Sequence, residues 1–275
     1  MIKYYRNCAE VVKLVNTTDS KSVASDGLWV QIPPSALFMP KAKLPNKDFK
    51  WTPNLAYATG LLATDGNLSK DGRHIIMRSS NFQLLKIFKN CLNLENRITC
   101  SGKERRTTKP SFRIQFSNVQ FYRWLLKIGL FPAKTYTTNA LQIPNKYFRD
   151  FLRGHLDGDG SISFYEDKYN EYRGRVYINN RLYLRFISAS LTHVKWLQSR
   201  IKQLFRLKGV IFKSERKNRR VPMWILKFSK KESISLLKTI YYKPNLPSLN
   251  RKREIAVLAL NMINNEKRKE YSWIK

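Results

Sequence analysis

Acidic side chains are scarce in this 275-residue sequence, which has 19 aspartates and glutamates against 52 lysines and arginines. The net charge is therefore 52 − 19 = +33, and a field of this size indicates a polyanionic partner, most commonly nucleic acid. Long apolar runs are missing too: no uninterrupted stretch of about 18 apolar residues and no secretory leader is found. We therefore expect no membrane partner.

Cysteine and histidine are also few, with three of each. Cys8, Cys91 and Cys100 show no C-x-x-C spacing, which argues against a structural zinc site and favours a reducing, intracellular compartment. Hydrophobic residues, in contrast, make up 43% of the sequence. That share supplies a core for one large domain or for two of about 100 to 150 residues, and it excludes a disordered basic tail.

One stretch of the sequence occurs twice. TGLLATDGNLS at residues 59–69 matches RGHLDGDGSIS at residues 153–163, with a constant offset of 153 − 59 = 94 positions. In the segments that follow, each half reads as helix, two strands, helix, two strands, helix. The pattern predicts an α+β fold of two pseudo-symmetric αββαββα repeats, at residues 47–133 and 148–275, joined by a linker at residues 134–147.

Both copies of the repeated stretch end a predicted helix with a credible start. Thr52-Pro53 provides an N-cap and a proline at the first helical position, and Pro144-Asn145 provides a cap for the second helix. Small residues four positions apart share one face of each helix. In the first helix they are Gly60 and Thr64, and in the second they are Gly154 and Gly158.

Two faces of small residues can bring two helix backbones unusually close. We therefore predict that the two helices pack together along the pseudo-two-fold axis, which places Asp65 and Asp159 side by side. Two adjacent carboxylates repel each other unless a cation lies between them. Their hard oxygen atoms suit Mg²⁺, or Mn²⁺ in its place.

With this duplicated motif the sequence resembles the single-chain LAGLIDADG homing endonucleases. ATGLLATDG at residues 58–66 and LRGHLDGDG at residues 152–160 stand for the nine-residue signature, and the resemblance covers residues 47–265. It implies that the antiparallel sheets of the two repeats form a saddle in the DNA major groove. It also implies that divalent metals at the base of the paired helices hydrolyse one phosphodiester in each strand of a long target, as in enzymes of introns and mobile elements.

The resemblance also assigns roles to single residues. Asp65 and Asp159 would be the catalytic metal ligands, joined by the backbone carbonyls of Thr64 and Gly158. The first copy departs from the pattern, since Ala63 stands where the second copy has Asp157, to which we assign a supporting role.

Family members also use a basic or amide side chain from the sheet beside each metal. The alignment of RIQFS with ILKFS nominates Gln115 and Lys227 for this catalytic role. The alternative is that both side chains only contact DNA phosphate.

Residues 173–187 (RGRVYINNRLYLRFI) predict a DNA-binding strand independently of any family. Basic, polar and aromatic residues occupy the odd positions, while apolar ones occupy most even positions, so one face is core and the other is cationic. A chain reversal at Asn179-Asn180 would keep this alternation. Arginine can read guanine or contact phosphate, whereas an ordinary solvated face would mix both signs of charge. The candidate DNA-binding residues are Arg173, Arg175, Tyr177, Asn179, Arg181, Tyr183 and Arg185, with Arg113 from the first repeat.

Residues 1–46 fall outside the repeat pattern, and we expect them to be disordered. Codons can be chosen so that residues 18–34 encode the anticodon and T arms of a transfer RNA gene, which would put the true start at Met39. An ordinary extension is the alternative.

Three function classes fit the sequence. The first is a site-specific, metal-dependent endonuclease that acts as a monomer on double-stranded DNA. The others are an intron RNA maturase of the same fold and a DNA-binding regulator that has lost catalysis.

Overall fold

The structure is a computed structural model that describes residues 49–103, 110–133, 139–172, 175–214 and 222–272. The predicted extension at residues 1–46 lies outside this part of the chain. The first repeat consists of α2 (Pro53–Asp65), β1 (Gly66–Leu68), β2 (His74–Ser79), α3 (Phe82–Cys91), β3 (Ile98–Lys103), β4 (Pro110–Ser117) and α4 (Val119–Lys127). The second consists of α5 (Phe148–Asp159), β5 (Ser161–Tyr172), β6 (Arg175–Ser188), α6 (Leu191–Phe205), β7 (Val210–Ser214), β8 (Met223–Phe228) and α7 (Lys230–Ile240), and α8 (Asn250–Ser272) follows it.

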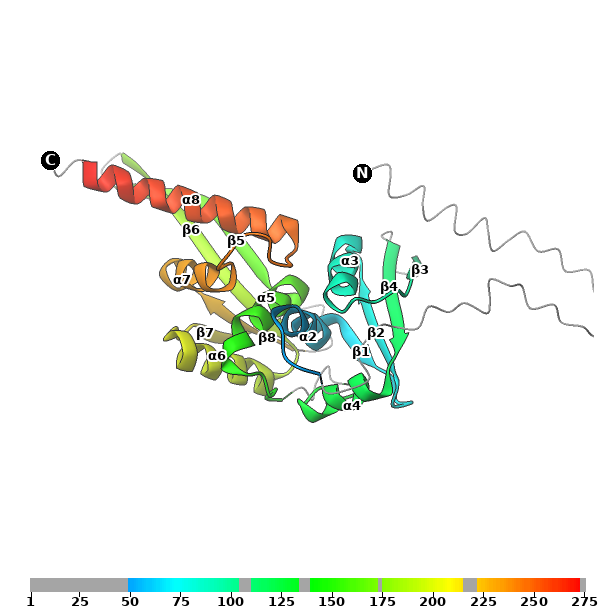
Figure 1. Cartoon of the computed structure of the whole chain (residues 1–275). Coiled ribbons are helices and arrows are strands. Elements are labelled where there is room, and N and C mark those ends of the chain that lie inside the picture. The colour runs from blue at the N-terminus through cyan, green and yellow to red at the C-terminus, as the bar shows by residue number, and fades with distance from the viewer. Residues whose placement is uncertain (1–48, 104–109, 134–138, 173–174, 215–221, 273–275) are drawn as a thin grey trace, which may run out of the picture.

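Each repeat builds one four-stranded antiparallel sheet, and the two sheets share one topology. The strand orders are β1-β2-β4-β3 and β5-β6-β8-β7. In Figure 1 the helices α2 and α5 lie together between the two sheets. The predicted α+β fold of two αββαββα repeats is confirmed. No helix in the described ranges is long and apolar enough to cross a membrane.

The starts of the two central helices differ from each other. The N-cap at Thr52 is as predicted, because its side chain accepts a hydrogen bond from the Leu55 amide at 3.1 Å and Pro53 follows it. The predicted cap at Pro144-Asn145 is wrong. Residues Asn145–Tyr147 form a 3₁₀ turn, and α5 begins only at Phe148. The Asn145 side-chain oxygen instead accepts a hydrogen bond from Arg200 of α6 at 2.7 Å.

The centre of the molecule is the contact between α2 and α5. A Cβ atom added to Gly60 would lie 2.7 Å from the His155 nitrogen, and it would overlap the Phe151 carbonyl. A Cβ atom added to Gly154 would lie 2.9 Å from the Tyr57 carbonyl carbon. These separations are shorter than any normal contact, so only glycine lets the two backbones approach this closely.

The glycines that end the two helices are needed for space and not for a left-handed backbone. Gly66 and Gly160 are extended, with φ of −81° and −84°. A Cβ atom at either position would lie 2.7 Å from the Cα atom of the leucine one turn earlier, Leu62 or Leu156. Each helix can therefore turn directly into the first strand of its sheet.

The inner faces of the sheets follow the two-residue period of a half-buried strand. In β4 the side chains of Ile114 and Phe116 are buried, while Gln115 between them is exposed. In β8 Leu226 and Phe228 are buried on either side of Lys227. The outer faces of both sheets are thereby left for polar and charged side chains.

Gly154→Ala tests the helix contact. We expect overpacking against the α2 backbone to reduce the free energy of unfolding by about 1 to 3 kcal/mol, although alanine favours an isolated helix by about 1 kcal/mol. Urea denaturation measures the difference. Ser235→Ala on the exposed side of α7 is the matched control and should leave stability nearly unchanged. A Gly154→Ala protein as stable as the wild type would contradict the close contact.

Candidate functional site

The two repeated acids lie at the joined ends of the central helices. Asp65 is the last residue of α2, and Asp159 is the last residue of α5. The residues just before them touch, since a Cβ atom at Gly158 would lie 2.8 Å from the Cβ atom of Thr64. Asp65 is half-buried and Asp159 is exposed. The fold therefore brings both carboxylates to one end of the helix pair, where solvent and a ligand can reach them.

A lysine that sequence analysis did not single out lies next to both acids. Lys252, in the first turn of α8, is only 5% exposed. Burial lowers the pKa of its ammonium group. The nearby carboxylates oppose this shift and raise the pKa; they belong to Asp157, Asp65 and Asp159. One ammonium group is thus close enough to both motif acids to interact with each of them.

The Lys252 ammonium group is bound to the last turn of α5. Its Nζ atom donates hydrogen bonds to the carbonyl oxygens of Leu156 at 2.5 Å, Asp157 at 2.9 Å and Gly160 at 2.8 Å. The carbonyl of Gly158 is 3.5 Å away. The Leu156 carbonyl also accepts a hydrogen bond from the Gly160 amide at 3.0 Å. Carbonyls at the end of a helix carry its negative dipole end, so a cation there is favourable.

Asp157, the second acid of the α5 motif, is buried away from this end. Its Oδ2 atom accepts hydrogen bonds from the Tyr57 hydroxyl and from the Leu249 amide, each at 2.8 Å. Burial raises the pKa of its carboxyl group to about 6, against the opposing effect of these two hydrogen bonds. Asp157 therefore ties α5 to both α2 and the start of α8. Ala63, its counterpart in α2, has no side-chain group that could do the same.

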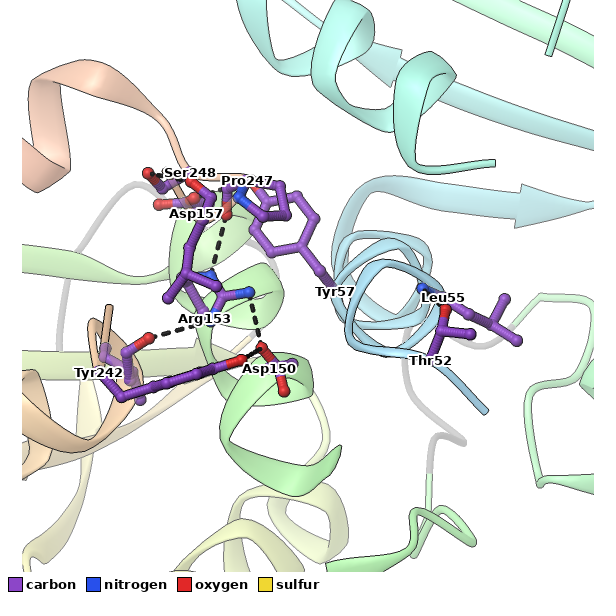
Figure 2. Close-up of polar contacts among 11 residues, drawn as sticks. Thr52, Leu55, Tyr57, Asp150, Arg153, Asp157, Tyr242, Pro247 and Ser248 are labelled. Atoms are coloured by element: carbon purple, nitrogen blue, oxygen red, sulfur yellow. Dashed lines mark hydrogen bonds and ion pairs between the residues drawn. The ribbon is translucent and has the colours of Figure 1, made fainter. Parts of the chain in front are cut away.

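Arg153 extends this buried polar network along α5. Its guanidinium is fully buried and donates to the carbonyls of Pro247 and Ile240, each at 2.9 Å. It also forms an ion pair with Asp150 at 2.8 Å, and the Tyr242 hydroxyl donates to the same carboxylate at 3.2 Å. Figure 2 shows these side chains between α5 and the segment that connects α7 to α8. The network fixes that segment, and with it the place of Lys252.

The oxygen atoms at the ends of α2 and α5 fit a hard divalent cation. Within the described ranges no group of three or more histidine, cysteine, aspartate or glutamate side chains could hold a metal. The carboxylates of Asp65 and Asp159, with the carbonyls of Thr64 and Gly158, would supply oxygen ligands only. Mg²⁺ accepts such a partial set because it keeps several waters and takes further ligands from phosphate groups.

The two sheet residues nominated beside the acids occupy equivalent positions. Lys227 pairs with Arg185 across β8 and β6, and Arg185 pairs with Ser161, two residues after Asp159. The first sheet has the same line of three residues, which are Gln115, Ile76 and Asn67. Asn67 comes two residues after Asp65. Gln115 therefore occupies the same register position relative to Asp65 as Lys227 occupies relative to Asp159.

The described part of the predicted DNA-binding strand alternates as expected. In β6 the even positions from Asn180 to Phe186 are buried, and the odd positions from Arg181 to Arg185 are partly exposed. Arg185 donates to the Ser163 hydroxyl at 2.7 Å, and the Lys227 ammonium lies 3.9 Å from the centre of the Tyr183 ring. Cationic and aromatic groups therefore share one face of the second sheet.

The conditional chain reversal is absent, and several of the candidate side chains lie outside the described part of the chain. The chain does not reverse at Asn179-Asn180: β6 runs through both residues, which pair with Asp167 and Glu166 of β5. Arg181 forms an ion pair with Asp167 at 2.8 Å, so its charge is partly neutralised. Arg173, and the side chains of Arg175 and Tyr177, lie outside the described residues. In the first sheet Arg113 is half-buried, and its Nε atom is 3.4 Å from the Thr99 hydroxyl.

Sequence analysis missed Lys252 and Arg153, although one of them has a visible signal. In α8 the buried positions recur with a helical period, and they are Lys252, Ala256, Ala259 and Ile263. A lysine on an otherwise apolar helix stripe indicates a buried ammonium group with carbonyl or carboxylate partners. The signal for Arg153 is weaker: its ion-pair partner Asp150 lies three positions earlier on the same helix, but its other partners are main-chain carbonyls more than eighty positions away.

Known proteins resemble this chain in structure but not in sequence. No protein-family profile and no curated protein matches the sequence. The I-LtrWI LAGLIDADG homing endonuclease, solved bound to target DNA, is 14% identical with a TM-score of 0.52 over 78% of this chain and 91% of that one. The meganuclease I-SmaMI, solved with uncleavable DNA, is 11% identical with a TM-score of 0.51 over 77% and 91%.

A third similar structure is full-length DUF199/WhiA from Thermatoga maritima. It is 14% identical, with a TM-score of 0.46 over 82% of this chain and 69% of that one. At such identities the first two structures establish the fold and not the activity. This chain has the fold of the LAGLIDADG homing endonucleases.

Proposed function

We propose that this protein is a site-specific endonuclease that uses divalent metal to cut both strands of a long double-stranded DNA target. The observation that carries the proposal is the meeting of Asp65 and Asp159 at the joined ends of α2 and α5. The strand register also places Gln115 and Lys227 at equivalent positions of the two sheets, each in line with the residue two positions after its own acid. An enzyme of this kind would be encoded by an intron or another mobile element.

Hydrolysis of a phosphodiester at this site would need a bound divalent cation and several groups of the protein. Mg²⁺ or Mn²⁺ would polarise the scissile phosphate and lower the pKa of a water molecule. Asp65 and Asp159 would hold the cation with their carboxylates, and the carbonyls of Thr64 and Gly158 would add neutral oxygens. The Lys227 ammonium would bind a phosphate oxygen, while the Gln115 amide would orient water or phosphate at the other strand.

The outer faces of the two sheets would bind the DNA. The net charge of +33 attracts the phosphate backbone, and a two-stranded ribbon such as β5-β6 fits the major groove. Contacts of Arg185 and Arg113 with phosphate would set the position of the duplex, and contacts with base edges would set the sequence. Because both acids belong to one chain, a monomer would be sufficient to reach both strands.

Asp65→Asn and Asp159→Asn test the role of the acids. Loss of a metal ligand removes several kcal/mol of transition-state stabilisation, so each variant should cut at least about 100-fold more slowly. The affinity for DNA should be retained, since each substitution removes no cationic contact and takes one negative charge away from the phosphates. Glu254→Gln, on the exposed side of α8, is the matched control.

The substrate for this assay is genomic DNA from a relative of the source that lacks the reading frame, with cut ends mapped by sequencing. The cloned target then serves for rate and affinity measurements. Cutting at the wild-type rate by either asparagine variant would refute the assignment. A wild-type protein that binds intron RNA and cuts no DNA would support the maturase, and one that binds DNA without cutting would support the regulator.

The salt dependence of DNA binding tests the proposed binding face. The logarithm of the binding constant should fall with the logarithm of salt concentration by about 0.9 per phosphate contact. Lys227→Ala and Arg185→Ala should each reduce the magnitude of this slope by about one. Lys238→Ala, on the exposed side of α7, should leave it unchanged. Slopes that fall equally in all three variants would mean that net charge, and not this face, binds DNA.

A further inference from the structure

A groove lies at the starts of the two central helices, away from the motif acids. It is lined by residues just before α2, by the end of α4, by residues 141–144 before α5 and by Arg200 of α6. Figure 1 shows α4 and α6 at the lower side of the molecule. The acids are at the other ends of α2 and α5, which have 13 and 12 residues. At about 1.5 Å per residue, about 18 Å separates the groove from the acids.

Aromatic rings form one side of this groove. The ring centres of Trp51 and Trp124 are 4.9 Å apart, and the ring of Phe49 is 5.9 Å from that of Trp124. Trp51 is also 6.5 Å from Tyr147, with the two rings 20° from parallel. All four side chains are half-buried. A row of aromatic surface therefore stays accessible to solvent beside the groove.

Cationic side chains lie along the same groove. Lys127, the last residue of α4, is exposed. The Arg200 guanidinium donates to the Ile143 carbonyl at 3.1 Å and to the Asn145 side chain at 2.7 Å. It also lies 5.2 Å from the centre of the Phe148 ring. These contacts fix the guanidinium at the groove, and among the described residues that line the groove none is acidic.

Aromatic surface next to cations is typical of sites for unpaired nucleotides. A base can stack on an exposed aromatic ring, and the phosphates beside it can bind lysine and arginine. The groove has a volume of about 680 Å³, which is in the range of ordinary ligand sites. A duplex cannot enter with its bases, because they stack on each other inside the double helix.

The charge and the polar groups of the groove favour RNA as the occupant. Unpaired bases that stack on aromatic side chains are typical of RNA loops and ends. Gln142, which is exposed at the groove, has an amide that can donate to and accept from a ribose 2′-hydroxyl or a base edge. A proline-rich peptide also binds aromatic grooves, but it carries no negative charge to match Lys127 and Arg200.

We propose that this groove binds single-stranded RNA and is a second nucleic-acid site, separate from the proposed DNA interface. An unpaired base stacks on Trp51 or Trp124, and Lys127 and Arg200 bind the neighbouring phosphates. Since the groove and the acids are at opposite ends of the helix pair, RNA and duplex DNA can be bound at the same time. The site does not depend on whether the protein cuts DNA.

Photocrosslinking locates the site on the unaltered protein. The probe is a short single-stranded RNA of mixed sequence that carries iodouridine, which crosslinks to aromatic side chains on irradiation. Mass spectrometry should find crosslinks at Trp51 or Trp124, and they should persist in excess duplex DNA of random sequence. Tyr165 and Tyr183 are the aromatic side chains of the β5-β6 hairpin. Crosslinks at these tyrosines alone would overturn the proposal, because the RNA would then lie on the proposed DNA-binding face.

Lys127→Glu tests the charge of the groove at an exposed position, where the substitution leaves the core intact. In a fluorescence anisotropy titration its affinity for the same RNA should fall at least about fivefold. The slope of the logarithm of the binding constant against that of salt concentration should shrink by about 0.7, the value for one phosphate contact of a single strand. Lys238→Glu, on the exposed side of α7, is the matched control and should lower the affinity less than about twofold.

Trp51→Leu and Trp124→Leu test the stacking of the base. Each should lower the RNA affinity at least about fivefold, because a stacked base loses its ring. Both indoles also pack on neighbouring rings, so thermal melting and duplex DNA binding are measured for each variant, and duplex DNA binding should be unchanged. If neither variant folds, Lys127→Glu and the crosslinks still decide.

Three results would contradict an RNA site in this groove. Equal losses in Lys127→Glu and Lys238→Glu would mean that net charge alone binds the RNA. Equal affinity and equal crosslinks for a DNA strand of the same sequence would contradict the choice of RNA. A proline-rich peptide that displaces no RNA but crosslinks to Trp51 and Trp124 in its place would identify the groove as a peptide site.

Discussion

The close contact between α2 and α5 is the constraint on which the rest of the structure depends. Gly60 and Gly154 remove the side chains that would hold the two backbones apart, and Thr64 lies against Gly158 one turn later. The helices must therefore run together to their last residues. Each then turns at a glycine into its own sheet, so the acids meet at one end and the two sheets spread from it.

The two repeats share their strand order and register, but they differ in the lengths of equivalent strands and in their side chains. The two sheets have the same strand order, and their registers place Gln115 and Lys227 alike. The polar support around the helices differs, because Asp157 binds Tyr57 and Leu249 while the first motif has Ala63. A single chain can vary its two halves independently. In this chain Lys252 of α8 donates hydrogen bonds to the carbonyls at the end of α5.

The fold could be predicted from the sequence because the patterns that determine it are local, and the helix motif occurs twice. Small residues four positions apart and the alternation of β6 define faces without knowledge of distant contacts. The start of α5 could not be predicted, since Asn145 has a distant partner in Arg200. The same holds for the main-chain partners of Lys252 and Arg153, which are carbonyls in other elements. Residue types say little about main-chain acceptors, so a buried cation is visible only as an exception on an apolar stripe.

We propose that the ends of α2 and α5 form one composite cation site from Asp65 and Asp159. Anomalous diffraction from crystals soaked in Mn²⁺ measures this directly. We expect manganese peaks within coordination distance of both carboxylates, close to the carbonyls of Thr64 and Gly158, and none at the buried Asp157. Manganese bound at Asp157, or at neither motif acid, would contradict it.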